Sequence, residues 1–581
     1  MMHTAPFVDV NAPDLSPSGA SAAKLAPQAW ISRYPKPLPG EVVGPLAGLV
    51  FAVKDNIDAH GLATTAACPA FTYQPPAHAT VVQKLLAAGA SLLGKTNLDQ
   101  FACGLNGTRS PYGAVPNAFN PAYVSGGSSA GSAYVVATGQ VDFALGTDTA
   151  GSGRVPAGLN NIVGLKPSRG LISNRGVVPA AQSVDCVSIF ARSVALAAQV
   201  LQVLAGYDTL DPYSRRLALA NQAWGGSFRF GIPSVLEFEG DEQACAAFAG
   251  AVTRLRALGG EPVLIDYAPL AGAAALLYDS ALVAERYSAV RHFFDAHEHA
   301  VMEPVRGILA QGRGYSAADL CEAQTRLRAF GQKAAAMWDG IDVLLVPTAP
   351  THYTIAQMQA DPVALNRKLG AYTNFVNLLD YAALSVPSSI RQDGLPFGIT
   401  LIGPCGSDWQ LAELGQRYHH ATGLAQGALD QPLPAPQPLA GMAMAAPGRM
   451  KLAVVGAHLS DMPLNGQLTE RGARLIEATR TAPHYRLYAL ANTTPPKPGL
   501  KRVLEAGSAI ALEVWDMPQQ EVGSFLALIP PPLGLGSIEL ADGSWVTGFI
   551  CEGHALEAAR DVTPHGGWRA YAASLLARPV G

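Results

Sequence analysis

The chain has 581 residues, a formal net charge of -4 and only 14% charged residues. This length predicts two or more domains, and the charge balance excludes a broad basic surface for nucleic acid. No apolar run reaches the roughly 18 residues that a membrane span needs, and the N-terminus lacks the pattern of a secretory signal. The seven cysteines are scattered singly, which argues against a zinc site or a disulfide framework and favours a reducing cytoplasm.

Apolar spacing predicts that helices and strands alternate along the chain. Helices are expected at residues 80–89, 133–137, 193–204 and 243–258, and short strands at residues 90–93, 187–190 and 343–346. Such alternation indicates an α/β layered domain. A stretch rich in proline and alanine follows, and a new strand is expected at 451–456. We therefore expect a large domain over 1–425, a linker over 426–449 and a C-terminal domain over 450–581.

Two turns rich in serine and glycine lie close together, at residues 125–132 (SGGSSAGS) and 146–154 (GTDTAGSGR). A serine nucleophile needs a base that takes its proton. The chain has no histidine between His78 and His292, so a neighbouring imidazole is not available. The nearest upstream candidate is Lys54, in the segment FAVKDNI. The pattern therefore indicates acyl transfer by a serine–lysine arrangement.

Three other interpretations of this region compete with that one. Residues 89–96 match the phosphate-binding pattern G-x-x-x-x-G-K-[ST], but the segment follows a helix and reads as an apolar strand, which contradicts that function. Residues 127–131 match the nucleophile elbow G-x-S-x-G, with Ser129 as nucleophile and a later histidine as base. That alternative gives no role to the second turn or to Lys54. A flexible linker is the third alternative, and the structured residues that follow argue against it.

Five segments, taken together, resemble the amidase signature family, whose serine hydrolases use a Ser-cisSer-Lys triad. They are residues 53–56 (VKDN), 94–101 (GKTNLDQF), 126–132 (GGSSAGS), 146–157 (GTDTAGSGRVPA) and 164–170 (GLKPSRG). The resemblance covers roughly residues 25–425 and implies an α/β fold with a mixed central β-sheet covered by helices. It also implies that Ser152 is the nucleophile, Ser128 the bridging serine in a cis peptide and Lys54 the base.

This triad is chemically sound only in a particular environment. Lys54 must be neutral to accept a proton, so its site should be desolvated. Ser128 then relays the proton from Ser152 to Lys54 and later returns it to the leaving ammonia. The turn Thr149, Ala150, Gly151 and Ser152 can aim backbone N–H groups at the carbonyl oxygen, an oxyanion hole worth about 3–4 kcal/mol per donor. Ala150 replaces the commoner glycine, and Asp148 and Arg154 are expected to be the scaffold of the turn.

Tyr278 and Arg286 are candidate substrate-binding residues. If residues 278–286 form one helix, eight residues bring the two side chains to within roughly 80° of each other. An arginine fork and a tyrosine hydroxyl can clamp a carboxylate, although an ordinary surface helix is the alternative. Allophanate hydrolases, a branch of the amidase signature family, have a Tyr and an Arg at this spacing that bind the substrate carboxylate. By the same resemblance Gly126 lies against the substrate.

The C-terminal region resembles the extra domain of allophanate hydrolases, a small α+β domain similar to γ-glutamyl cyclotransferases, on residues 454–468, 534–540 and 548–552. The resemblance implies that His458 is a base that processes N-carboxycarbamate, with Glu552 as a second candidate. It further implies hydrolysis of allophanate in urea or s-triazine (cyanuric acid) catabolism by a cytoplasmic homodimer, with no metal, cofactor, nucleic acid or membrane partner. Another amidase, or the amidase subunit of a tRNA-dependent amidotransferase, is the alternative.

Overall fold

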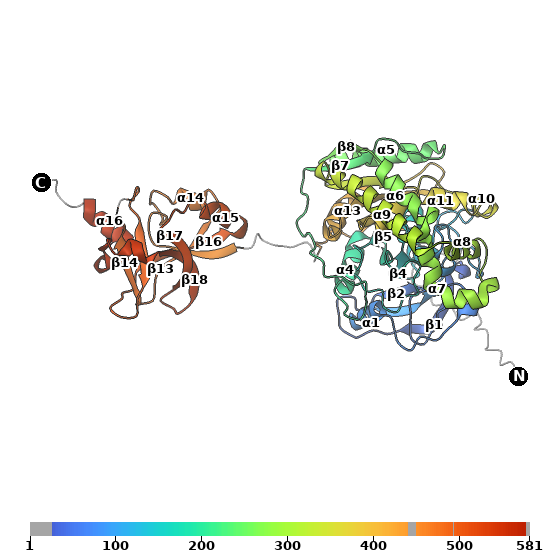
Figure 1. Cartoon of the computed structure of the whole chain (residues 1–581), viewed down its shortest axis with the longest axis horizontal. Helices are drawn as coiled ribbons and strands as arrows, with labels where there is room; N and C mark the ends of the chain where they lie inside the picture. Colours follow the sequence, from blue (N-terminus) through green and yellow to red (C-terminus); the bar gives the residue numbers. More distant parts are fainter. Residues whose placement is uncertain (1–25, 440–448, 492, 577–581) are drawn as a thin grey trace. The chain divides into compact units, whose positions relative to one another are not determined.

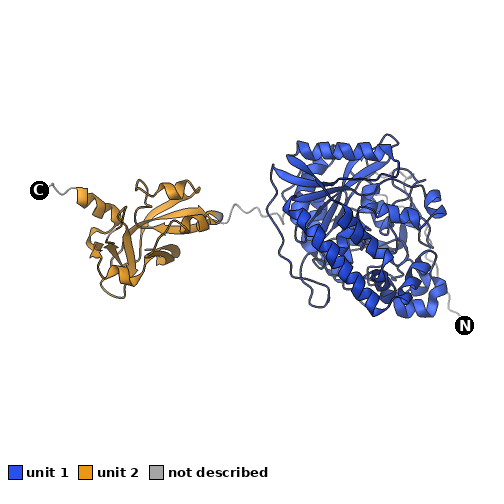
Figure 2. Cartoon of the chain, turned by 45° about the horizontal axis from the view of Figure 1, so that its top comes forward, with its two compact units in different colours: residues 1–443 blue, residues 444–581 orange. Residues whose placement is uncertain are grey.

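The computed structural model describes residues 26–439, 449–491 and 493–576. The chain divides into two compact units, residues 1–443 and 444–581 (Figure 2). None of the described helices is long and apolar enough to cross a membrane. Residues 440–448 of the expected linker lie outside the described residues. The preceding part of that segment packs along the first unit, where Leu439 is buried in the core and Asn161 Nδ2 donates to the Gly427 carbonyl at 2.8 Å.

The first unit is built on one mixed sheet of eleven strands, in the order β1-β3-β2-β4-β6-β5-β10-β11-β9-β7-β8. The strands are β1 Trp30–Leu38, β2 Val50–Lys54, β3 Ser91–Thr96, β4 Phe143–Asp148, β5 Val163–Lys166, β6 Cys186–Ala191, β7 Phe228–Pro233, β8 Gly260–Ile265, β9 Val343–Pro347, β10 Ala382–Ile390 and β11 Pro396–Gly403. The strands expected at 90–93, 187–190 and 343–346 correspond to β3, β6 and β9.

Helices surround this sheet (Figure 1). They are α1 Thr80–Ala87, α2 Ala130–Ala137, α3 Val155–Leu159, α4 Val194–Leu204, α5 Glu242–Ala257, α6 Ala268–Asp279, α7 Ala284–His297, α8 Val305–Gln311, α9 Ala317–Ala335, α10 Ile355–Ala360, α11 Ala364–Leu369, α12 Asn374–Leu378 and α13 Asp408–Thr422. The four helices expected from apolar spacing correspond to α1, α2, α4 and α5. Ser193 caps α4 by accepting from the N–H of Leu196, which explains why that helix begins where it does.

The sheet is buried on both faces because its strands are apolar on both sides. In β2, Phe51 and Val53 join one buried cluster, whereas Ala52 between them joins another. Helices α1, α4, α5 and α13 cover the first face. Helices α2, α3, α6, α9 and α12 cover the second face. The expected mixed sheet covered by helices is thus confirmed.

The second unit is a small α+β structure with its own buried core. A five-stranded sheet in the order β13-β16-β12-β18-β17 accompanies a three-stranded sheet in the order β15-β14-β19. Its elements are β12 Arg449–Val454, α14 Gly466–Thr469, β13 Arg474–Arg480, β14 Tyr485–Ala489, β15 Pro498–Arg502, β16 Ala511–Pro518, α15 Gln519–Leu526, β17 Leu533–Glu539, β18 Trp545–Cys551, β19 Arg560–Asp561 and α16 Trp568–Leu576. The strand expected at 451–456 corresponds to β12.

Candidate active site

Neighbouring elements bring the predicted lysine and serines to one edge of the large sheet. Strands β2 and β4 are adjacent and parallel, so their carboxyl ends lie at the same edge, where α/β sheets place their ligands. Lys54 is the last residue of β2, and the turn 149–152 follows directly after β4. Ser128 comes just before α2, which packs on β4. Residues from three distant segments therefore meet at one site.

Lys54 is fully buried, and its amino group contacts two hydroxyl groups. Nζ donates to Ser128 Oγ and to Thr147 Oγ1, both at 2.7 Å. Burial removes water from the ammonium group and lowers the pKa of Lys54 to about 7, although three nearby carboxylates act to raise it. A substantial fraction of Lys54 is therefore neutral near pH 7, and the neutral amine can accept a proton from Ser128 across the same contact.

The backbone around Ser128 is tightly enclosed. The peptide between Gly127 and Ser128 is cis, and the carbonyl oxygen of Ser128 accepts from the Asp99 N–H at 3.1 Å. A Cβ atom at position 127 would collide with the Asp99 carboxylate, so only glycine fits there. The same carboxylate accepts from the N–H groups of Asn106 and Gly107 at 3.2 and 3.1 Å. Asp99 thereby holds the loop around residue 106 against the bridging serine.

The turn that carries Ser152 is held from inside by Asp148. The Asp148 carboxylate accepts from the N–H groups of Gly151 and Gly153 at 2.9 and 3.0 Å, and it pairs with Arg154 at 2.9 Å. Burial by itself would raise the pKa of Asp148, but Arg154 and the other contacts bring it below its usual value. Asp148 is thus an ionised anchor of the turn, in the scaffold role that the sequence predicts for it and Arg154.

These contacts decide which N–H groups of the turn can meet a substrate. The N–H of Gly151 is taken by Asp148, whereas those of Ala150 and Ser152 have no acceptor among the described residues. Ser152 Oγ donates to the Gly104 carbonyl at 3.4 Å. No hydrogen bond joins Ser152 to the bridging serine in the described part of the chain. Such bonds are often long in a site without substrate and tighten when it binds.

Ser129 and residues 89–96 have structural roles. Ser129 Oγ donates to the Thr147 carbonyl at 3.1 Å and accepts from the Thr147 N–H at 3.3 Å, so this hydroxyl ties α2 to β4. Residues 91–96 form strand β3 and do not open a helix. The nucleophile elbow and the phosphate-binding loop therefore both lack the geometry that they require.

Gly126 is buried beside the bridging serine. Its backbone has a φ of 77°, in the left-handed region that favours glycine. A Cβ atom here would collide with the backbone of Pro156 in α3. The structure thus places Gly126 between the two serine turns, where its role in the packing of the site is clear.

Tyr278 and Arg286 lie on two helices, and the expectation of one continuous helix is wrong. Helix α6 ends at Asp279, a short 3-10 helix spans Ala281–Val283, and α7 then begins. Ser280 breaks the helix because its backbone is extended and its hydroxyl accepts from the Leu282 N–H at 3.3 Å, in place of a helical bond. The predicted pair is nevertheless brought together, since Arg286 Cζ lies 5.4 Å from the centre of the Tyr278 ring.

Arg286 is a buried cation with unsatisfied donors. The residue is 3% exposed, and its Nε and Nη1 atoms have no hydrogen-bond partner among the described residues. An unpaired buried charge is costly, so such donors mark a place for an anionic group. Tyr278 packs in the same apolar cluster as Ala150, which places the pair beside the turn of Ser152.

Two polar residues of the site were missed from the sequence. Thr147 contacts Lys54, and its signal was present, because it stands at the end of a strand inside the second serine motif. Asp185 accepts from the Thr149 hydroxyl at 2.5 Å. No motif identifies Asp185, since it becomes a neighbour of Thr149 only through the pairing of β4 with β6, in which Asp148 lies opposite Cys186.

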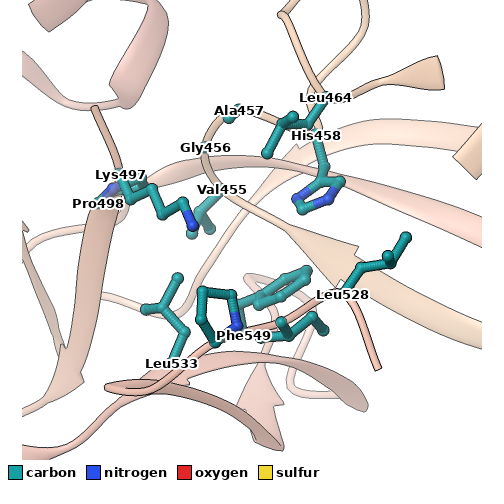
Figure 3. Close-up of a pocket in the computed structure, with 12 residues that line it drawn as sticks. Val455, Gly456, Ala457, His458, Leu464, Lys497, Pro498, Leu528, Leu533 and Phe549 are labelled. Atoms are coloured by element: carbon teal, nitrogen blue, oxygen red, sulfur yellow. The ribbon is translucent and has the colours of Figure 1, made fainter. Parts of the chain in front are cut away.

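The second unit contains a hollow with about 430 Å³ of empty space, part of it open to solvent. Figure 3 shows His458 and Lys497 at its sides and the ring of Phe549 between them. The His458 ring stacks on Phe549 with centroids 5.2 Å apart, and its Nε2 lies 2.9 Å from Gln467 Oε1. Burial lowers the pKa of His458, so its ring is neutral near pH 7. Glu552 is exposed and pairs with His554 at 3.2 Å, outside this hollow.

The fold and the lysine–serine site define a class of hydrolase, and comparisons with known proteins agree. The family model described as Amidase matches residues 19–412. The chain belongs to the amidase family. A second model, described as the allophanate hydrolase C-terminal domain, matches residues 450–573. The chain therefore combines the amidase domain with the additional domain that the sequence predicted.

Relatives with both parts are found among urea amidolyases. The urea amidolyase of Lachancea kluyveri is 46% identical over 542 residues, which is 91% of this chain and 30% of that protein. The solved allophanate hydrolase of Kluyveromyces lactis is 44% identical with a TM-score of 0.71, covering 91% of this chain and 89% of that one. The chain thus spans about 30% of the length of the curated relatives that it matches first.

A further solved relative resembles the first unit. This protein, from the glutamyl-tRNA(Gln) amidotransferase of Thermotoga maritima, is 29% identical with a TM-score of 0.62. The match covers 70% of this chain and 91% of that one.

Proposed function

We propose that this chain hydrolyses allophanate, the carboxylate of urea, and releases ammonia from it. The observation that carries the proposal is Arg286, whose buried and unpaired donors require an anionic group beside the nucleophile turn. Allophanate presents a small carboxylate next to an amide, which suits a guanidinium fork and the Tyr278 hydroxyl. The 44% identity to an allophanate hydrolase over nearly the whole chain supports this substrate.

In the proposed reaction Ser152 attacks the terminal amide carbonyl. Its proton passes through Ser128 to neutral Lys54, and the same route returns it to the leaving nitrogen, which departs as ammonia. Water then enters by the same relay and releases N-carboxycarbamate. The 2.7 Å contact between Lys54 and Ser128 and the lowered pKa of Lys54 support the basic end of the relay.

The oxyanion of the tetrahedral intermediate is assigned to the turn 149–152. The N–H groups of Ala150 and Ser152 are its donors, because they lack partners within the described residues, whereas Gly151 is held by Asp148. Thr149 contributes through the position of the turn. Gly126 allows close approach of the substrate backbone. Each donor aimed at the developing charge stabilises the transition state by about 3–4 kcal/mol.

We assign the next step to the second unit. N-carboxycarbamate loses carbon dioxide when a proton is delivered to its nitrogen, which leaves carbamate, and carbamate then falls apart into ammonia and carbon dioxide. His458 exchanges that proton, since its ring is uncharged and lines the hollow. Lys497 lines the same hollow and supplies positive charge toward a dicarboxylate.

The surroundings of the enzyme are also proposals. All seven cysteines are unpaired, which supports a reducing cytoplasm, and we propose a homodimer. The name of the urea amidolyases supports a place in urea degradation. Allophanate from the opening of an s-triazine ring is the alternative source.

The test is ammonia release from allophanate compared with biuret, malonamate and glutamine. Allophanate is expected to have the highest kcat/KM, because it alone combines the carboxylate and the urea amide. Turnover of glutamine without allophanate would refute the proposal and favour a role within an amidotransferase, to which the first unit is also similar.

A further inference from the structure

Asp185 occupies a place in the site that the proposed relay does not use. It directly precedes β6, and the antiparallel pairing of β6 with β4 puts it across from Thr149, the first residue of the nucleophile turn. Its carboxylate accepts from the Thr149 hydroxyl at 2.5 Å and from the N–H groups of Ala180 and Ala181 at 2.8 and 3.1 Å. The carboxylate is thus pinned from one side by a loop and from the other by the turn.

The turn 149–152 is therefore held by two carboxylates with different surroundings. Asp148 grips its far end and has its own cation, Arg154, in direct contact. Asp185 grips its near end and has no cation in hydrogen-bond contact among the described residues. The nearest positive charge that acts on Asp185 is Arg286, the proposed carboxylate-binding residue. Asp185 also acts on Lys54 through its charge.

We infer that Asp185 is a positioning residue for the hydrolysis step, and this inference rests on the proposed function. Through Thr149 it fixes the turn so that the N–H groups of Ala150 and Ser152 point at the same spot. Through its charge it keeps Lys54 more basic. Alignment of a donor affects the transition state more than the bound substrate, so the effect falls on kcat.

The electrostatic part has a definite sign. Lys54 faces Asp99, Asp185 and Asp148, which raise its pKa, and Arg286, which lowers it. The hydroxyls of Ser128 and Thr147 contact it directly. Removal of the charge at Asp185 therefore lowers the pKa of Lys54. Because the neutral amine is the active form, the acidic limb of the pH profile moves to lower pH.

The test compares Asp185→Asn with Thr149→Ser, Thr149→Val and the control Asp408→Asn. Asp408 is likewise buried and accepts from a hydroxyl and an N–H, those of Ser168, at 2.6 and 2.8 Å, but it contacts no residue of the turn. We expect Asp185→Asn to lower kcat for allophanate about 10- to 100-fold with little change in KM. Its acidic limb moves down by about half a pH unit or more. Thr149→Ser retains kcat, Thr149→Val loses it, and Asp408→Asn keeps the wild-type pH profile.

A second readout separates this inference from the choice of substrate. The rate at which a fluorophosphonate labels Ser152 reports the reactivity of the serine without any amide substrate. Slower labelling of Asp185→Asn with a shifted pH profile supports the inference even if allophanate proves to be the wrong substrate. Wild-type kcat and labelling rate in Asp185→Asn would overturn it. A lower kcat with an unshifted acidic limb would also overturn it, because general loosening of the fold produces that result.

Discussion

Replacing Arg286 with methionine removes a buried guanidinium but keeps most of the side-chain volume, so it isolates the proposed carboxylate contact. Nε and Nη1 are the two unpaired donors. A hydrogen bond to a charged partner contributes about 1.5–3 kcal/mol, so the loss of both costs about 3–6 kcal/mol. Since about 1.4 kcal/mol is a factor of ten, kcat/KM for allophanate should fall by about 10²- to 10⁴-fold.

The assay is steady-state ammonia release with allophanate and with biuret, which has a neutral carbamoyl group in place of the carboxylate. For allophanate most of the loss should appear as a higher KM, because the carboxylate is bound in both the ground and the transition state. Biuret turnover should change far less, so the preference for allophanate collapses. Arg286→Lys should recover only part of the loss, since an ammonium group lacks the planar fork.

The matched control is Arg291→Met on the same helix. The Arg291 side chain is 64% exposed and forms only a long pair with Asp295 at 3.7 Å, so its removal should leave both substrates unaffected. An Arg286→Met enzyme with the wild-type KM for allophanate would refute the reasoning. So would an equal loss on allophanate and biuret, because that result means a general disturbance of the site.

Three further predictions concern the two proposed reaction steps. Lys54→Ala and Ser152→Ala should each lower kcat at least about 10³-fold, with folding checked by circular dichroism; substantial turnover in either would remove that residue from the triad. Activity should rise with pH through about 7 as Lys54 becomes neutral, and kcat/KM that is flat between pH 5 and 9 would contradict the lysine base. His458→Ala should still release the first ammonia at the wild-type rate but accumulate N-carboxycarbamate, visible by ¹³C NMR at alkaline pH; unchanged carbon dioxide release would exclude the second role.

Local sequence patterns were sufficient where neighbours along the chain decide the outcome. Helix α4 begins at the serine cap that the sequence presents, and β3 is recognisable from a short apolar run after Gly89. The same reasoning failed at residues 278–286. There the helical pattern is continuous in composition, but the Ser280 hydroxyl competes with the backbone bonds and splits the helix.

The sequence by itself determined the reactive groups of this protein: a lysine, two serine turns, and a second domain after a proline-rich segment. Each is written in contiguous residues whose chemistry is intrinsic to them. Only the tertiary structure decided the pKa of Lys54, the engagement of Gly151 by Asp148, and the meeting of Arg286 with Tyr278. These depend on desolvation and on the pairing of β2, β4 and β6, which bring together residues that lie far apart in the chain.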